Sequence, residues 1–234
     1  MSIITCSDVS FAYEGVTVVG GLNFEVCGGD YLCVVGENGS GKSTLIKGLL
    51  RLIAPSRGSL STSGVKQSEI GYLAQQTAVQ KDFPACVYEV VLSGRLASRG
   101  ILPFYSRKDK SVAQEYISKF GIDSLRRCCF RDLSGGQQQR TLLARALCAA
   151  KKMLIIDEPA GGLDPRAVQE FYRFIESVNK ENGLTVIMVS HDVRSAAKYA
   201  SHILHLKNRQ IFFGATKDYL RGEISKSFMG GFYD

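Results

Sequence analysis

Short apolar stretches and segments with helical spacing alternate along most of the chain. Three of the apolar stretches are rich in β-branched residues, and each is followed by a segment whose apolar positions recur at helical intervals. These pairs are 31–35 with 42–52, 153–157 with 165–180, and 185–190 with 193–200. Such alternation is typical of parallel strands joined by crossover helices. We therefore expect an α/β fold in which a mainly parallel core sheet carries helices on both faces.

The first third of the chain has strand signals but few helical ones. Strand-like stretches lie at 3–13, 16–19, 22–26 and 70–73. Strands that follow one another without a crossover helix pair antiparallel, so we expect an N-terminal antiparallel β subdomain beside the core. Near the C-terminus, strand-like stretches on both sides of Lys207 and Asn208 predict a hairpin, which a short helix follows.

The segment between Phe83 and Phe130 has no strand signal. Helical spacing at 87–96 and 108–120 predicts an inserted α-helical subdomain there. No linker, low-complexity tract or internal repeat separates the parts of the chain, so we expect one domain. Its parts are a core of about 1–82 and 136–234 and an insertion of about 83–135.

The composition is that of an ordinary soluble globular protein, because 45% of the 234 residues are hydrophobic and 22% are charged. No apolar run approaches the roughly 18 residues that a membrane-spanning helix requires. The first ten residues contain neither a basic leader nor an apolar stretch of signal-peptide length. We therefore expect a protein that is neither secreted nor membrane-spanning.

The seven cysteines are scattered without CxxC spacing, which favours reduced thiols in a cytosolic compartment over a disulfide scaffold or a zinc site. Cys128 and Cys129 are adjacent, which suits neither chelation nor an ordinary disulfide. The net charge of +7 comes from dispersed basic residues without a nucleic-acid-binding motif. We expect no nucleic-acid partner, and the positive charge also suits ATP and an anionic membrane surface.

A glycine-rich loop lies between a predicted strand and a predicted helix. Its sequence GENGSGKS fits G-x-x-x-x-G-K-[ST], whose backbone N–H groups converge on phosphate oxygens at the start of a helix. Lys42 is then expected to reach the β- and γ-phosphates of ATP, and the Ser43 hydroxyl to bind Mg²⁺. The nucleotide-binding residues predicted here are Gly36, Glu37, Asn38, Gly39, Ser40, Gly41, Lys42, Ser43 and Thr44.

Two carboxylates follow a second buried strand, in the sequence MLIIDEP. The carboxyl ends of the strands are where α/β sheets bind their ligands. We predict that Asp157 holds Mg²⁺ and that Glu158 is the general base that polarises the attacking water.

The stretch LSGGQ, at Leu133–Gln137, opens a predicted helix with a serine and two glycines, which makes a second anion site without a lysine. It resembles the signature motif of the ATP-binding cassette (ABC) ATPases. The resemblance implies that Ser134, Gly135, Gly136 and Gln137 of one protomer close over the γ-phosphate held by the other. The active form that it implies is a head-to-tail dimer of two copies.

The resemblance extends from Tyr13 to about Phe213 and implies further roles. Tyr13 matches the aromatic residue that stacks on adenine, and Gln75 the Q-loop glutamine that contacts Mg²⁺ and water. Asp164 matches the D-loop aspartate that crosses the dimer interface, and His191 the switch histidine at the γ-phosphate. Two positions depart from the family pattern, Ala74 and Ala160, and neither removes a catalytic group. The implied catalytic residues are Lys42, Gln75, Glu158 and His191.

The segment Lys81–Arg95 resembles the permease-contacting stretch of importers for divalent metal ions such as zinc or manganese. The resemblance places Phe83 and Pro84 beside a groove for a cytoplasmic helix of the permease. It implies an ATPase that is peripheral on the inner face of the cell membrane, with transmembrane permease subunits and, indirectly, a substrate-binding protein as partners. An importer of siderophores or vitamins and a soluble ABC ATPase of the iron–sulfur assembly type remain alternatives.

Overall fold

The computed structural model describes residues 1–75, 82–99, 104–158, 165–191 and 193–230. The chain forms two compact units. Unit 1 comprises Met1–Gly64 and Tyr172–Asp234, and unit 2 comprises Val65–Phe171. The domain boundaries that we expect from the sequence stay a prediction.

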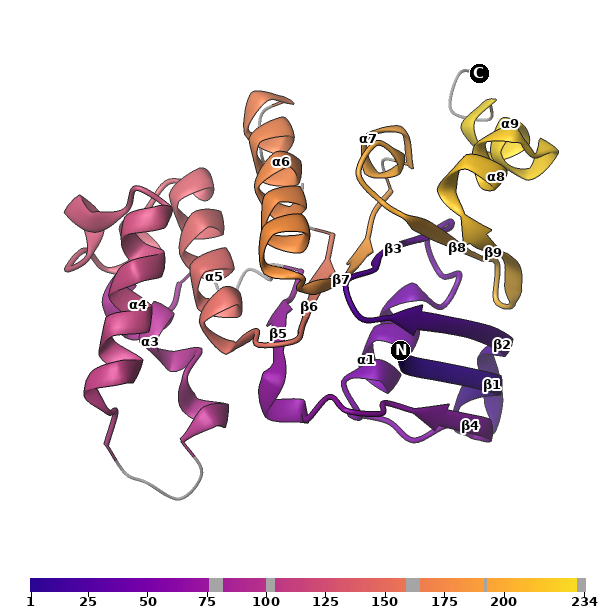
Figure 1. The fold of residues 1–234 in the computed structure, drawn as a ribbon, viewed down its shortest axis with the longest axis horizontal. Helices are drawn as coiled ribbons and strands as arrows, with labels where there is room; N and C mark the ends of the chain where they lie inside the picture. The colour runs from indigo at the N-terminus through magenta and orange to yellow at the C-terminus, as the bar shows by residue number, and fades with distance from the viewer. Residues whose placement is uncertain (76–81, 100–103, 159–164, 192, 231–234) are drawn as a thin grey trace. The chain divides into compact units, whose positions relative to one another are not determined.

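Unit 1 contains the mainly parallel sheet that the sequence predicts. Strand β3 (Tyr31–Val35) lies between β7 (Thr185–Val189) and β8 (His202–Leu206) and is parallel to both, whereas β9 (Gln210–Ala215) pairs antiparallel with β8. All residues of β3 and β7 are buried, as expected for strands covered on both faces. The helices that lie wholly in this unit are α1 (Lys42–Leu49), α7 (Val193–Ala197), α8 (Thr216–Arg221) and α9 (Glu223–Gly230). Figure 1 shows their order along the chain.

The antiparallel subdomain is also present in unit 1, with different strands from those predicted. β1 (Ser2–Tyr13) pairs with β2 (Val16–Cys27), which is one continuous strand instead of the two expected. The third strand is β4 (Arg57–Ser61), which the sequence pattern missed. Its side chains are mostly polar and exposed, so this edge strand carries no apolar signal. The expectation that 70–73 belongs to this sheet was wrong.

The segment 70–73 instead forms a strand of unit 2 that pairs parallel with a partner. β5 (Ile70–Leu73) runs parallel to β6 (Met153–Asp157), with Leu73 opposite Ile156. A glycine, Gly71, lets helix α5 (Gly135–Ala149) pack closely on β5, since a Cβ there would lie 2.2 Å from the carbonyl oxygen of Ala146. The strand pairs parallel because a long helical segment, and no tight turn, separates it from its partner.

The helical insertion that the sequence predicts forms the rest of unit 2 (Figure 1). Helices α3, α4 and α5 surround an apolar core that includes Val91, Ile117, Phe130 and Ala144. The predicted helix at 87–96 is shorter than expected and ends at Ser93. The regular elements are α3 (Val87–Ser93), α4 (Arg107–Lys119), α5 (Gly135–Ala149) and short 3₁₀ turns at Gln67–Glu69, Leu96–Ser98, Asp123–Leu125 and Phe130–Asp132. Helix α6 (Pro165–Asn182) runs from unit 2 into unit 1.

A buried ion pair fixes the ends of these helices. Arg95 Nε lies 2.9 Å from Asp109 Oδ1, and both side chains are about nine-tenths buried. The same guanidinium donates to the carbonyl oxygen of Cys148 at 2.8 Å. Hydrogen bonds from the Ser106 hydroxyl, then the Arg95 guanidinium, lower the pKa of Asp109 to about 2. A charged pair that is this fully hydrogen-bonded stabilises the packing of α4 against α5.

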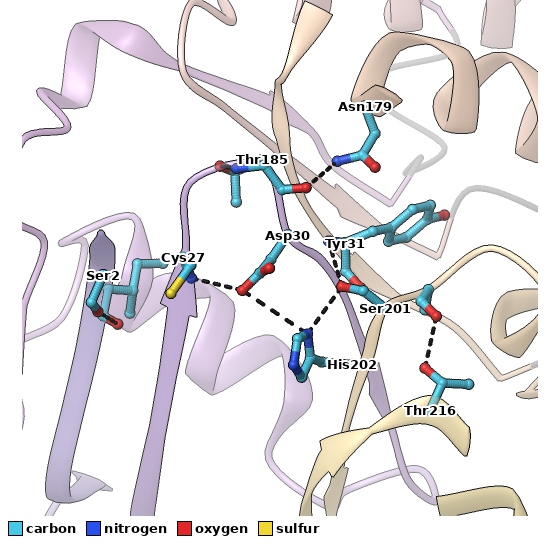
Figure 2. A network of polar contacts seen from close by, with 12 residues as sticks. Ser2, Cys27, Asp30, Tyr31, Asn179, Thr185, Ser201, His202 and Thr216 are labelled. Atoms are coloured by element: carbon cyan, nitrogen blue, oxygen red, sulfur yellow. Dashed lines mark hydrogen bonds and ion pairs between the residues drawn. The ribbon is translucent and has the colours of Figure 1, made fainter. Parts of the chain in front are cut away.

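A polar network joins the starts of β3 and β8 in unit 1 (Figure 2). The Ser201 hydroxyl accepts from the Tyr31 amide at 3.0 Å and lies 3.0 Å from His202 Nδ1, which is 4.0 Å from Asp30 Oδ2. A hydrolytic triad needs the serine and the carboxylate on different ring nitrogens, and here both face Nδ1. This network therefore anchors the sheet. No helix among the described residues has the length and hydropathy to cross a membrane.

Candidate functional site

The glycine-rich loop connects β3 to α1 in unit 1, as the sequence predicts. Gly36, Gly39 and Gly41 have φ angles of 150°, 79° and 99°, which favour glycine. A Cβ on Gly36 would lie 2.3 Å from the carbonyl oxygen of Leu206, and one on Gly41 would lie 2.6 Å from Val19 Cβ. The backbone of Leu206 thus requires glycine at one end of the loop, and the side chain of Val19 requires it at the other.

Lys42 and Ser40 give this loop the chemistry of an anion site. The Lys42 side chain is buried, and its Nζ donates to the carbonyl oxygens of Gly36 at 2.9 Å and Glu37 at 2.8 Å. The Ser40 hydroxyl is also buried and has no hydrogen-bond partner among the described residues. A buried ammonium with a buried hydroxyl at a helix start fits a phosphate group.

Asn208, at the turn between β8 and β9, forms hydrogen bonds with the backbone of the glycine-rich loop. Its side-chain Nδ2 donates to the carbonyl oxygens of Gly39 and Val18, both at 3.1 Å, and its backbone N–H donates to Ser40 O at 3.1 Å. Asn208 has a φ of 55°, a conformation that asparagine tolerates better than most residues. This contact was not predicted from the sequence, in which Asn208 indicates only a hairpin turn.

Tyr13 and His191 lie in the same unit as the loop. Tyr13 ends β1, its side chain is 41% exposed, and Lys47 Nζ lies 5.9 Å from the centre of its ring. His191 is exposed and follows β7, which is parallel to β3 with Val34 opposite Val189. The carboxyl ends of parallel neighbours meet at one edge, so His191 lies at the sheet edge that bears the loop.

Unit 2 holds the acidic half of the predicted site. β5 and β6 end side by side, and Gln75 Nε2 donates to Glu158 Oε2 at 2.8 Å. Glu158 has a φ of 48°, a strained value for a residue with a side chain. Asp157 ends β6 with its side chain buried. Burial, followed by the nearby Asp157 charge, raises the pKa of Tyr72 to about 12.

The signature residues begin α5 in the same unit. Ser134 is the N-cap, and its hydroxyl accepts from the Gln137 amide at 3.4 Å, while Gln137 Oε1 accepts from the Ser134 amide at 2.9 Å. This capping box leaves the amides of Gly135 and Gly136 to other acceptors. A Cβ at either glycine would meet no described atom within 4 Å. Packing within the described part of the chain thus gives no reason for glycine at these two positions.

The predicted site residues therefore fall into two sets. The loop, Tyr13 and His191 belong to unit 1, whereas Gln75, Asp157, Glu158 and the signature residues belong to unit 2. The loop and His191 follow the parallel strands β3 and β7 in unit 1. Gln75, Asp157 and Glu158 lie at the ends of the parallel strands β5 and β6 in unit 2. Asp164 and Ala160 lie outside the described residues. A single site made from both sets stays a prediction.

Comparison with known proteins gives the family. Residues 19–161 match the ABC transporter family. The zinc uptake system ATP-binding protein ZurA of Listeria monocytogenes is 34% identical over 224 residues, covering 93% of this chain and 87% of ZurA. The manganese transport system ATP-binding protein MntB of Bacillus subtilis is 34% identical over 232 residues, covering 97% of this chain and 92% of MntB.

A solved structure gives the same result for the fold. The chain matches a transporter described as metal-chelate type, in an inward-facing conformation, with a TM-score of 0.86 and 26% identity. The match covers 98% of this chain and 90% of the other. Because relatives this similar span nearly the whole chain, and not the phosphate loop alone, the chain belongs to the ABC transporter family of ATP-binding cassettes.

Proposed function

We propose that this protein binds and hydrolyses ATP to power a membrane importer of divalent metal ions such as zinc or manganese. The observation that carries the proposal is the similarity to the zinc and manganese transport proteins over more than nine-tenths of the chain. Both relatives are named as ATP-binding subunits of transport systems. Their names favour transport over the alternative of a soluble ATPase for iron–sulfur assembly, and metal ions over siderophores or vitamins.

Lys42 supports the proposed grip on ATP. Its ammonium is held by two loop carbonyls, those of Gly36 and Glu37. A phosphate oxygen that enters the loop carries a full negative charge, so it is a stronger acceptor for the ammonium than a carbonyl. The buried Ser40 hydroxyl adds a donor inside the loop. The exposed ring of Tyr13 offers a face for the adenine.

The donor set at the ends of the strands fits Mg²⁺. Mg²⁺ takes oxygen ligands and is commonly held by few protein groups together with the phosphates of the substrate. Ser43, Gln75 and Asp157 are the residues that would hold it, and a buried carboxylate such as that of Asp157 is stabilised by a cation. Held there, the ion would supply positive charge beside the phosphates, which suits phosphoryl transfer.

Glu158 is the group proposed to accept a proton from the attacking water. One of its oxygens already accepts a hydrogen bond from Gln75. That bond fixes the orientation of the carboxylate at the end of β6, where a general base must be held within reach of the water. His191 is proposed to contact the γ-phosphate from the end of β7.

The glycines of the signature support a dimer in which two copies share each ATP. Glycine is a poor helix former, and no described atom lies close enough to require it at Gly135 or Gly136. Open space above two helix-start amides suits an anion brought by another molecule. We propose that this anion is the γ-phosphate bound to a second copy. ATP would then join the two copies, and hydrolysis would release them.

The proposed partners in the membrane are permease subunits, with a substrate-binding protein acting through them. Phe83 is 54% exposed and Phe104 is 83% exposed, both in the helical part of unit 2. Phe83 is also the residue for which the resemblance implies a permease contact, and its exposure leaves the ring accessible to such a partner. The protein would thus lie at the cytoplasmic face of the membrane.

The experiment is to purify the protein from membranes with its associated proteins and to measure ATP hydrolysis in vesicles. We expect a polytopic permease to copurify and zinc or manganese, supplied with the binding protein, to stimulate ATPase activity. Stimulation by a siderophore or a vitamin, and not by either metal, would overturn the metal assignment. Full activity without any membrane partner would overturn the transport role.

A further inference from the structure

Two cysteines that are far apart in the sequence lie opposite each other in unit 2. Cys86 and Cys129 form an isolated antiparallel β-bridge. Cys86 is the N-cap residue of α3, and Cys129 precedes the 3₁₀ turn that leads to the signature motif. Both side chains are half-buried and both are free thiols. We refer to these two residues as the cysteine pair.

The backbone hydrogen bonds define the geometry of the cysteine pair. The Val87 amide donates to the carbonyl of Cys128 at 3.0 Å, and the Phe130 amide donates to the carbonyl of Ala85 at 2.8 Å. These two bonds lie on either side of the pair and involve neither of its members. In antiparallel strands this pattern marks a non-hydrogen-bonded pair, whose Cα atoms are about 4.5 Å apart and whose side chains point to one face.

That spacing meets the requirement for a disulfide. Bonded cysteines have Cα atoms roughly 4.4 to 6.8 Å apart. The pairing cannot slip along the chain, because Val87 and Phe130 on either side of it are buried in the core of unit 2. The next residues hold it further, since Tyr88 N donates to Arg126 O at 3.1 Å and the Arg126 guanidinium lies 4.3 Å from the Tyr88 ring centre.

The other thiols are placed differently. Cys6, Cys33 and Cys148 are buried, and burial raises the pKa values of Cys6 and Cys148 to about 12, so these two thiols stay protonated and unreactive. Cys128 is exposed and directly precedes Cys129 in the sequence. The main-chain pairing, however, places Cys129 and not Cys128 opposite Cys86. Cys27 is half-buried, but its partner in the β1–β2 ladder is Ser2 and not a cysteine. Formation of an intramolecular disulfide is therefore directed to the cysteine pair.

We propose that Cys86 and Cys129 are a modification site at which small-molecule disulfides form a reversible intramolecular disulfide. One thiolate of the pair attacks a sulfur of the reagent, which releases one reagent thiol and leaves a mixed disulfide on the protein. The second thiolate attacks the protein sulfur of that mixed disulfide and releases the second reagent thiol. Two protein thiols are oxidised, one reagent disulfide is reduced, and the two protons end on the released thiols.

The disulfide would tie the start of α3 to the segment before the signature motif. It would close a loop that contains α4, because α4 (Arg107–Lys119) lies between the two cysteines in the sequence. Closing a loop of this length restricts the unfolded chain and stabilises the native one. For a chain of this size we expect the melting temperature to rise by at least about 4 °C.

The test treats the full-length protein with oxidised glutathione under native conditions. Remaining thiols are then counted with a maleimide in denaturant, disulfide-linked peptides are mapped by mass spectrometry, and the melting temperature is measured. We expect five of the seven thiols to remain, a peptide pair that joins Cys86 to Cys129, and a melting temperature that dithiothreitol returns to its original value.

Three variants complete the test. Cys86→Ser and Cys129→Ser should lose the linked peptide and the thermal shift, whereas Cys128→Ser, the neighbouring and exposed control, should keep both. A bond between Cys128 and Cys129, a bond between two chains, or mixed disulfides alone would overturn the proposal. The peptide map of the unsubstituted protein decides it even where a serine variant fails to fold.

Discussion

Gln75 donates a hydrogen bond from Nε2 to Oε2 of Glu158, and the two atoms lie 2.8 Å apart. The two residues follow neighbouring parallel strands, so their meeting is a direct result of the pairing of β5 with β6. Glu158 holds the bond with a strained backbone, at a φ of 48°. Strain of this kind persists where surrounding contacts enforce it and is common at functional sites.

We predict that Glu158→Gln abolishes hydrolysis while ATP binding is kept, because the amide cannot accept a proton. The turnover rate should fall at least about 100-fold, and the protein should accumulate as an ATP-bound dimer in size-exclusion chromatography. Glu181→Gln makes the same chemical change at an exposed position of α6 and should have no effect. A Glu158→Gln variant that hydrolyses ATP at near the normal rate would remove Glu158 from the role of base.

Lys42→Ala is expected to remove the buried ammonium from the phosphate loop. Charge-assisted hydrogen bonds to phosphate are the strong ones, so the dissociation constant for ATP should rise at least about 100-fold, which is near 2.7 kcal/mol. A titration with a fluorescent ATP analogue measures this. Lys110→Ala, at an exposed position in α4, is the matched control. Unchanged binding in Lys42→Ala would contradict the assignment of the loop.

Substitutions at Asn208 test whether its hydrogen bonds to the phosphate loop contribute to ATP binding. Asn208→Gly keeps the positive φ but deletes the amide that donates to Gly39 and Val18, and Asn208→Asp places a charge against those carbonyls. We expect ATP affinity to fall about fivefold to tenfold in both, because one of the two lost hydrogen bonds, that to Gly39, supports the loop directly and is worth about 1 kcal/mol. Lys207→Gln, next to it on the same turn, should bind ATP normally. Equal affinities in all three variants would restrict Asn208 to a role in the hairpin.

The buried pair of Arg95 and Asp109 predicts an acid-sensitive helical insertion. The pKa of Asp109 is about 2 in the folded protein and 3.8 in the reference state, so its contribution is complete above about pH 4 and is lost as the pH falls to about 2. The contribution amounts to about 2 kcal/mol. Asp109→Asn should cost about 3 kcal/mol at neutral pH, because it leaves Arg95 buried and uncompensated.

Urea unfolding at several pH values measures this effect. The difference between the parent protein and Asp109→Asn should shrink between pH 4 and pH 2, and Asp218→Asn, at an exposed position, should follow the parent. A difference that stays constant down to pH 2 would show that the Asp109 carboxylate does not stabilise the fold through its charge.

The sequence alone determined the parts whose signal is local. A strand followed by GENGSGKS fixes the phosphate loop, since the glycines, the lysine and the helix start are contiguous. The apolar runs before Asp157 and His191 fixed the buried strands in the same way. The weakly apolar and exposed strand β4 left no such signal, and the parallel pairing of β5 depended on a partner strand far along the chain.

The tertiary structure decided the relationships that need two distant segments. Nothing in the sequence near Asn208 points to the phosphate loop, because the contact arises only when β8 lies beside β3. The seven cysteines showed no spacing typical of a bond, yet the packing of α3 against the segment before the signature sets Cys86 opposite Cys129. Local propensity and motifs depend on neighbouring residues and can be recognised in the sequence. Strand register and core packing bring together residues that are distant in the sequence.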